Sequence, residues 1–297
     1  MSYAVFSCDL DTIDAHLQGY GFDDVPPCDL VYRRAVPRVL ELLAELGVPG
    51  VLFTIARDAE RERTLLRQGV AAGHEVASHS LTHPQPFRTL DDATLRHELA
   101  ASRARLAEAT GAEVLGFRAP AWDVDARVLR MVHAAGYRYD ASVFPTPALL
   151  ASRLAAYRRS RGKRSIFSMD MVGHAFASLR PHRTGDGATR LVEFPISVTR
   201  WLRFPVYHTV SHLVPSWLFG RALRSLLRSG LPVCYEFHGA DLLDLAGDGV
   251  DPRMARHPGM GVPLARKRQA LRDILATIAR ERRVVTYRAA LEPAFAS

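Results

Sequence analysis

The feature that most constrains the fold is a regular alternation of short apolar segments with amphipathic segments along the first half of the chain. Tyr3 to Cys8, Val51 to Ile55, Glu75 to Ser78 and Val114 to Arg118 are short runs typical of buried strands. The segments with helical spacing of apolar residues are Arg34 to Leu46, Glu62 to Ala72, Asp91 to Thr110 and Asp125 to Ala135. Each of these is followed by a glycine, a common helix end. This alternation of predicted strands and helices indicates an α/β protein with a parallel sheet covered by helices, and a closed barrel is one form of that architecture.

The second half of the chain continues the pattern less regularly. Leu191 to Ile196, Pro232 to Phe237 and Val284 to Tyr287 are predicted strands, and Gln269 to Arg282 is a predicted helix. We find no internal repeat and no low-complexity linker, so we expect residues 1–297 to form a single domain. The three cysteines are odd in number and lack CxxC spacing, which favours core residues over a disulfide framework.

The charge and the N-terminus bear on partners and location. The net charge of +8 favours anionic partners such as phosphates, nucleic acids or anionic lipid surfaces, without choosing among them. No run of about 18 apolar residues is present, so we expect no transmembrane helix. The start MSYAVFSCDLDT has neither a basic start nor a long apolar region, so we expect no signal peptide and a cytoplasmic location.

Two carboxylates and two histidines form the strongest candidate for chemistry. Asp9 and Asp11 follow the first predicted strand, where side chains two apart share a face, although a pair of turn aspartates would look the same. His79 and His83 stand four apart near the end of another strand, a spacing that on a helical turn places both imidazoles on one side. Two histidines and one carboxylate can hold a divalent ion and leave positions open for water and substrate.

A second histidine pair has the same spacing. His208 and His212 lie in a loop-rich stretch after Phe204 and Pro205, with no acidic residue nearby in sequence. We therefore place the metal at the first pair and keep the second as an alternative.

Two further polar residues stand at predicted strand ends. Arg118, in FRAPAW, could hold a carboxylate by a bidentate contact, although an ordinary surface arginine would look no different. His238 follows an apolar strand directly and could act as a general acid, although a lone histidine there is often structural.

Taken together, the motifs resemble those of the polysaccharide deacetylases, the carbohydrate esterase family 4 type, in a variant whose first motif is DxD. The matching segments are CDLDT, HEVASHSLTHP, FRAPAW, GYRYDASVFP, VEFPIS and EFHGADLL, and they extend from about Ser7 to Asp244. Leu10 separates two aspartates that are adjacent in the commoner form of the family, and FHGAD replaces the usual last motif. These departures leave the substrate open.

The resemblance implies a fold, a metal and roles for individual residues. The implied fold is a deformed (β/α) barrel of seven or eight mainly parallel strands, and the usual ion is Zn²⁺, with Co²⁺, Ni²⁺ or Mn²⁺ accepted by related enzymes. The implied roles are metal binding for Asp11, His79 and His83, general base for Asp9, orientation of that base for Arg118, and general acid for His238. Trp122, Asp140 and Asp241 are predicted to border the substrate, with Asp241 orienting His238.

The implied reaction is hydrolysis of an N-acetyl or N-formyl amide on an amino sugar. With no signal peptide expected, we predict a cytoplasmic or lipid-carrier-linked precursor as substrate and no nucleic-acid partner. Val214 to Arg228 has the pattern of a basic amphipathic helix able to lie on an anionic membrane, and an ordinary core-packing helix gives the same stripe. The basic run Ala151 to Ser165 could contact a lipid-linked phosphate or be a solvated loop. A small-molecule amidohydrolase of the atypical allantoinase type and a non-catalytic carbohydrate-binding relative are the alternatives.

Overall fold

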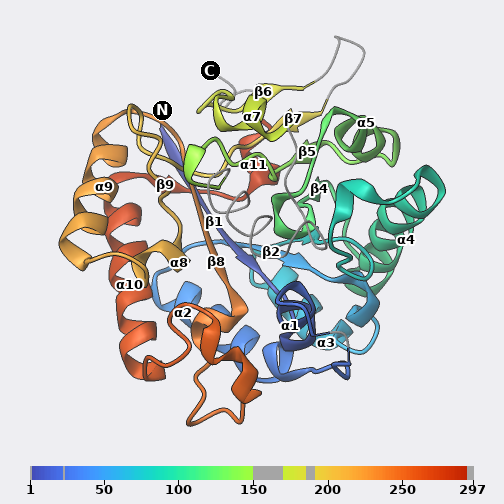
Figure 1. Cartoon of the computed structure of the whole chain (residues 1–297), viewed down its shortest axis with the longest axis horizontal. Helices are drawn as coiled ribbons and strands as arrows, with labels where there is room; N and C mark the ends of the chain where they lie inside the picture. The colour runs from blue at the N-terminus through green and yellow to red at the C-terminus, as the bar shows by residue number, and fades with distance from the viewer. Residues whose placement is uncertain (1, 23, 150–169, 185–190, 293–297) are drawn as a thin grey trace.

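The protein is built around one curled sheet surrounded by helices (Figure 1). The computed structural model describes all residues except 1, 23, 150–169, 185–190 and 293–297. In the described part the sheet has nine strands in the order β6-β7-β5-β4-β3-β2-β1-β8, and β9 pairs with the start of β1. All pairs are parallel except that of β6 with β7. After β7 the chain reaches β8, where Ser197 N donates to Cys234 O, so the two ends of the sheet come together.

The strands are short except at the centre of the sheet. They are β1 Tyr3–Asp9, β2 Val51–Thr54, β3 Glu75–Ser78, β4 Gly116–Phe117, β5 Tyr139–Asp140, β6 His182–Arg183, β7 Val192–Glu193, β8 Val233–His238 and β9 Arg283–Val284. The expected deformed barrel is confirmed, with nine strands in place of the predicted seven or eight. The strands that the sequence did not predict, β5 and β6, contain two residues each, too few to show a sequence pattern. The predicted strand Val284 to Tyr287 is strand only at Val284, because Tyr287 begins α11.

The helices surround the curled sheet, and the longer ones cover its outer face (Figure 1). They are α1 Ile13–Gly19, α2 Val36–Glu45, α3 Arg63–Ala71, α4 Asp92–Thr110, α5 Ala126–Ala134, α7 Asp170–Ala175, α8 His208–Ser211, α9 Ser216–Arg228, α10 Leu264–Glu281 and α11 Tyr287–Ala290. Asp91 caps α4, and Gly111 ends it in the left-handed conformation, as the sequence predicts. No helix in the described part is long and apolar enough to cross a membrane.

The alternation of side chains along β1 places the candidate site inside the barrel. Ala4 and Phe6 point outward to the core shared with α2, α9 and α10, while Tyr3 and Val5 belong to the interior cluster. Asp9 has the same parity as Tyr3 and Val5, so it points inward at the carboxyl end of the strand. Active sites of parallel barrels form at this end.

Two predicted segments differ from the structure or lie outside the part that it describes. The predicted helix from Gln269 begins five residues earlier, at Leu264 directly after Pro263, because proline is tolerated at a helix start. The basic run Ala151 to Ser165 lies outside the described residues. The single domain over residues 1–297 stays a prediction.

Candidate metal centre and active site

Asp11, His79 and His83 come together at the carboxyl ends of β1 and β3. Asp11 Oδ1 lies 2.9 Å from Nε2 of His79 and 3.4 Å from Nε2 of His83. The two imidazole centroids are 4.8 Å apart, and all three residues are buried. The structure thus brings together the three residues predicted from the sequence as metal ligands.

The loop between the two histidines is not the helical turn that their spacing suggested. His79 follows β3 directly, and Ser80 and His83 have positive φ values of 65° and 62°. The side chain of Glu98, on α4, accepts hydrogen bonds from Leu81 N at 2.9 Å and from Thr82 N at 3.0 Å. A buried carboxylate on the neighbouring helix therefore fixes the loop that presents both imidazoles.

We expect Glu98→Leu to lower the free energy of unfolding by about 2–4 kcal/mol, because buried donors in the loop lose their acceptor. Affinity for a divalent ion should fall roughly 10- to 100-fold, as for other residues that orient metal ligands. Urea unfolding and titration with Zn²⁺ measure the two effects. Glu108→Leu, at an exposed position of the same helix, is the matched control and should change neither. A Glu98→Leu protein that binds zinc as the wild type does would exclude this role.

The donor set fits a divalent cation. Nδ1 of His79 lies 2.8 Å from the carbonyl oxygen of Arg118, which can only accept a hydrogen bond, so Nε2 of the neutral ring presents a lone pair to Asp11. Among the described residues, Asp11 Oδ1 and His83 Nε2 have no hydrogen-bond partner although both are buried. A cation bound among these atoms would remove the repulsion between the lone pairs and satisfy all three groups.

The electrostatics of the three side chains agree with this interpretation. Burial opposes ionisation of Asp11, yet His83 and His79 hold its pKa well below the usual range. Burial also opposes a charge on His79, but Asp11 and Asp9 raise its pKa to about 9. Burial lowers the pKa of His83 to about 4, so this ring is neutral near pH 7. Asp11 and Asp9 therefore favour a positive charge beside His79, which a bound cation would supply in place of the proton, and His83 is already a neutral ligand.

Asp9 lies beside the metal centre and is held by Arg118. Its Oδ2 is 3.8 Å from His79 Nε2, and its Oδ1 accepts a hydrogen bond from Arg118 Nη1. Arg118 is fully buried, stacks 4.1 Å from the ring centre of Phe53 and also donates to Ser7 Oγ at 3.1 Å. The predicted bidentate contact is wrong, because only Nη1 of Arg118 donates to Asp9, whereas Nη2 donates to Ser7. The guanidinium still orients Asp9.

Glu236 is a site residue that the sequence reasoning missed. Its Oε2 lies 3.5 Å from Arg118 Nη1 and accepts from Trp122 Nε1 at 3.0 Å. Burial raises its pKa to about 7 despite Arg118. The i, i+2 relation to His238 in β8 is the sequence signal, because both side chains must share the inward face of the strand.

His238 ends β8 next to these carboxylates and reaches the cavity. Burial would lower its pKa, but Asp11, Asp9, Glu236 and Asp241 raise it. Asp241 Oδ2 accepts from the backbone N–H of His238 at 2.8 Å, so the predicted orientation of the ring acts through the main chain.

The second histidine pair also has an acidic neighbour in space. His208, His212 and Asp241 have ligand atoms within 4.8 Å of one another, a group hidden from sequence because α8 packs on β8. However, neither imidazole lines the cavity. Burial lowers the pKa of both histidines, with a smaller contribution from the buried ammonium of Lys267, which also interacts with Asp241. A divalent ion is therefore better placed at the first pair.

A cavity of about 230 Å³ opens onto the centre. Its lining includes carboxylate, imidazole, phenol and indole side chains, from Asp9, Asp11, His16, Tyr20, His79, Trp122, Tyr207, His238 and His257. Tyr20 and the histidines His16 and His257 carried no motif in the sequence. Trp122 has a positive φ of 55°, an uncommon backbone state that directs its indole into the cavity.

Two of the predicted substrate contacts do not line this cavity. Asp140 is fully buried and accepts from Ser142 N and Ser142 Oγ, both at 2.9 Å, which makes it a support of the loop after β5. Asp241 contacts the backbone of His238 and does not itself line the cavity. Of the three predicted contacts, Trp122 alone reaches the cavity.

Comparison with known proteins finds relatives of part of this chain. The family model for polysaccharide deacetylase matches residues 18–139, which include His79, His83 and Arg118. A chitooligosaccharide deacetylase of Sinorhizobium fredii is 40% identical over 84 residues, 28% of this chain and 39% of the relative. A peptidoglycan deacetylase of Helicobacter pylori is 26% identical over 147 residues, 46% of this chain and 48% of the relative. The chain thus matches less than half the length of these relatives.

Solved structures share the fold over nearly the whole chain. A structure from Mycobacterium smegmatis named as a polysaccharide deacetylase superposes with a TM-score of 0.63 at 19% identity, covering 96% of this chain and 87% of the other. A PuuE allantoinase superposes with a TM-score of 0.56 at 14% identity, covering 95% and 85%. The chain is thus similar to the polysaccharide deacetylase family over residues 18–139, and it shares the fold of these solved structures over nearly its whole length.

Proposed function

We propose that the protein is a metal-dependent hydrolase that removes the acetyl group from an N-acetylated amino sugar. The observation that carries the proposal is the convergence of Asp11, His79 and His83 beside Asp9, with Asp9, Asp11 and His79 in the wall of one cavity. The relatives named as deacetylases support the reaction class. All residues implied by the resemblance are present, which disfavours a non-catalytic relative.

Asp11, His79 and His83 would hold the ion, and Asp9 is assigned as the base. A divalent ion supplies a Lewis acid for the acyl carbonyl and lowers the pKa of water. The Asp9 carboxylate is fixed by Arg118 on one oxygen, while its other oxygen faces His79 at the metal centre. That free oxygen is placed to take the proton from the attacking water.

His238 is assigned as the acid for the departing nitrogen. It lines the same cavity, and although burial opposes its charge, the surrounding carboxylates raise its pKa and so favour the protonated form. An amine leaves far more readily once protonated, which gives this proton a direct role in bond breaking.

The cavity suggests how a sugar is held. Its volume, about 230 Å³, suits one sugar residue with its acyl group better than a longer segment. The indole of Trp122 presents an apolar face for the sugar ring, and its N–H is fixed by Glu236. A formyl group, a lipid-linked precursor and the cytoplasmic location remain finer predictions of the same proposal.

The test is release of acetate from N-acetylglucosamine oligomers, measured by mass spectrometry on protein loaded with Zn²⁺, Co²⁺, Ni²⁺ or Mn²⁺. We expect near-stoichiometric metal, loss of activity after chelation, and loss of both metal and turnover in His79→Ala. His212→Ala, in the second histidine pair, should keep both. Hydrolysis of allantoin without deacetylation would favour the allantoinase alternative, and an active metal-free protein would exclude the mechanism.

A further inference from the structure

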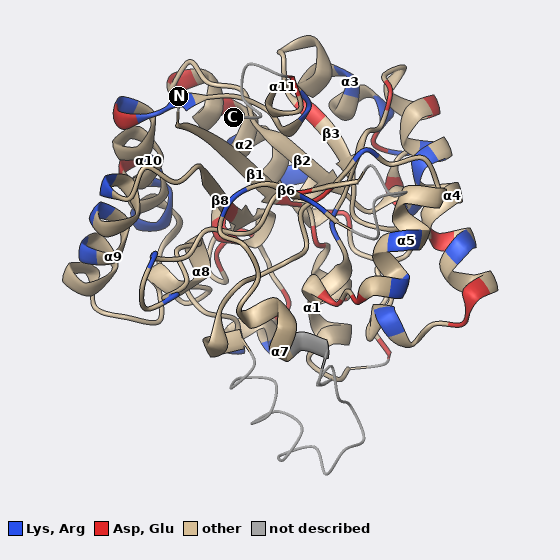
Figure 2. Ribbon diagram, turned by 90° about the horizontal axis from the view of Figure 1, so that it is seen from above, with Lys and Arg blue, Asp and Glu red and all other residues tan. Residues whose placement is uncertain are grey.

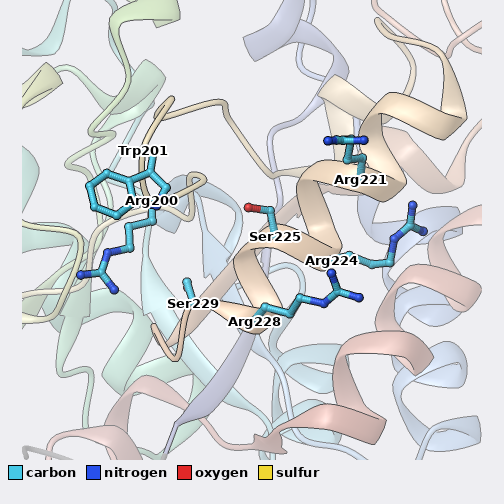
Figure 3. Close-up of a pocket in the computed structure, with 7 residues that line it drawn as sticks. All are labelled: Arg200, Trp201, Arg221, Arg224, Ser225, Arg228 and Ser229. Atoms are coloured by element: carbon cyan, nitrogen blue, oxygen red, sulfur yellow. The ribbon is translucent and has the colours of Figure 1, made fainter.

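A strongly basic cavity lies apart from the active site, between α9 and the hairpin of residues 197–206. It has a volume of about 590 Å³, and its lining includes Arg200, Trp201, Arg221, Arg224 and Arg228 (Figure 3). We call these residues the arginine surface. The three arginines of α9 are spaced by three and four residues, so they share one face of the helix.

The charges of the arginine surface are not compensated. In the part of the chain that the structure describes, none of its four arginines forms an ion pair with a carboxylate, and α9 contains no acidic residue. On α4 basic and acidic side chains are mixed, whereas α9 shows only basic ones (Figure 2). Four exposed guanidinium groups around one cavity create a local positive potential suited to phosphate oxygens.

Large apolar side chains border the arginine surface and project into solvent. The exposed fractions are 84% for Trp201, 85% for Leu202 and 68% for Trp217. Trp217 precedes Arg221 by one helical turn, so it lies on the same face of α9. The opposite face of α9, with Phe219, Leu223 and Leu226, is packed into the core.

We propose that the arginine surface docks the protein on a lipid bilayer that carries anionic headgroups. Arginines bind lipid phosphates, and exposed tryptophan and leucine side chains enter the interfacial layer, where an indole is favourable. A soluble anion would account for the arginines but leave the exposed Leu202 without a partner. A nucleic acid could stack on Trp201, but it too offers no apolar surface for the leucine.

The docking surface is connected to the active site through one short segment. The hairpin that carries Trp201 continues directly into Tyr207 and Thr209, which line the catalytic cavity, and α8 leads from there to α9. Docking therefore fixes both ends of the segment that forms one wall of the cavity. The inference does not depend on the chemistry proposed for that cavity.

Flotation with vesicles tests the proposal. We expect the protein to bind vesicles of phosphatidylcholine and phosphatidylglycerol at low salt, and to bind pure phosphatidylcholine weakly. Replacing Arg221, Arg224 and Arg228 by Gln should weaken binding about 100-fold, from roughly fivefold per charge. The matched control replaces Arg96, Arg105 and Arg130, exposed arginines of α4 and α5, by Gln; it removes the same charge and should bind as the wild type does.

A second variant separates the apolar part from the charge. Trp201→Ser with Trp217→Ser should weaken binding even at high salt, where the arginine contribution is screened. If the two triple-arginine variants lost vesicle binding equally, the effect would be one of net charge, and the proposal would be overturned. So would release of vesicle-bound protein by millimolar inorganic phosphate, or tighter binding to single-stranded DNA than to the vesicles. Deacetylation of a soluble substrate should be equal in all variants, which separates a failure here from a failure of the proposed function.

Discussion

Asp9→Asn is expected to lower kcat by roughly 10²- to 10⁴-fold while the protein still binds its metal. Asparagine has nearly the same shape but cannot take a proton from water at neutral pH. The carbonyl oxygen of the amide can still accept from Arg118, so the position of the side chain should be kept. The fall should therefore appear in kcat, with a small change in KM.

The measurement is turnover of an N-acetylated oligomer together with metal content by mass spectrometry. Asp14→Asn is the matched control, because Asp14 is also buried and paired with an arginine, Arg57, but does not line the cavity. It should reduce stability without a comparable loss of kcat. Full activity in Asp9→Asn would remove Asp9 from its role as base, and loss of metal in the same variant would make it a ligand instead.

The metal centre could be predicted because its residues sit at the ends of strands with clear patterns. β1 is a mostly apolar run, β3 is short and buried, and in a parallel sheet their carboxyl ends meet at one edge. The conformation between His79 and His83 could not be predicted in the same way. It depends on Glu98, which belongs to a helix 15 residues further along the chain and shows no motif of its own.

The later part of the barrel was harder to predict for a geometric reason. Leu191 to Ile196 has the composition of a strand, but only Val192–Glu193 pairs as one, since the sheet curls sharply there and the next residues turn toward β8. The acidic neighbour of His208 and His212 is Asp241, about 30 residues away, so proximity in sequence was the wrong criterion. Glu236 was missed because its neighbours in the strand are apolar, and its polar partner, Arg118, is distant in the sequence and close only in the folded protein.

Arg118→Met is expected to lower the free energy of unfolding by about 3–5 kcal/mol at pH 8, the usual cost of leaving a buried charge without its partner. The guanidinium has no exposed surface and stands between Asp9 and Glu236, at 3.5 Å from the latter. Methionine fills much of the volume, so the loss is mainly electrostatic. Arg127→Met, in an exposed pair with Asp92, is the control and should cost less than about 1 kcal/mol.

The cost of Arg118→Met should also depend on pH in a definite direction. Burial raises the pKa of Glu236 to about 7 even with Arg118 present, and without Arg118 it must rise further. A carboxyl whose pKa is higher in the folded state binds more protons there than in the unfolded chain, so the protein loses stability as pH rises between the unfolded and folded values. The destabilisation should therefore be larger at pH 8 than at pH 5, where Glu236 takes up a proton, when both are measured by urea unfolding with chelator present. Arg118→Met combined with Glu236→Gln should recover part of the loss at pH 8. An equal cost at both pH values, or no recovery in the double variant, would mean that Arg118 acts by packing rather than by its charge.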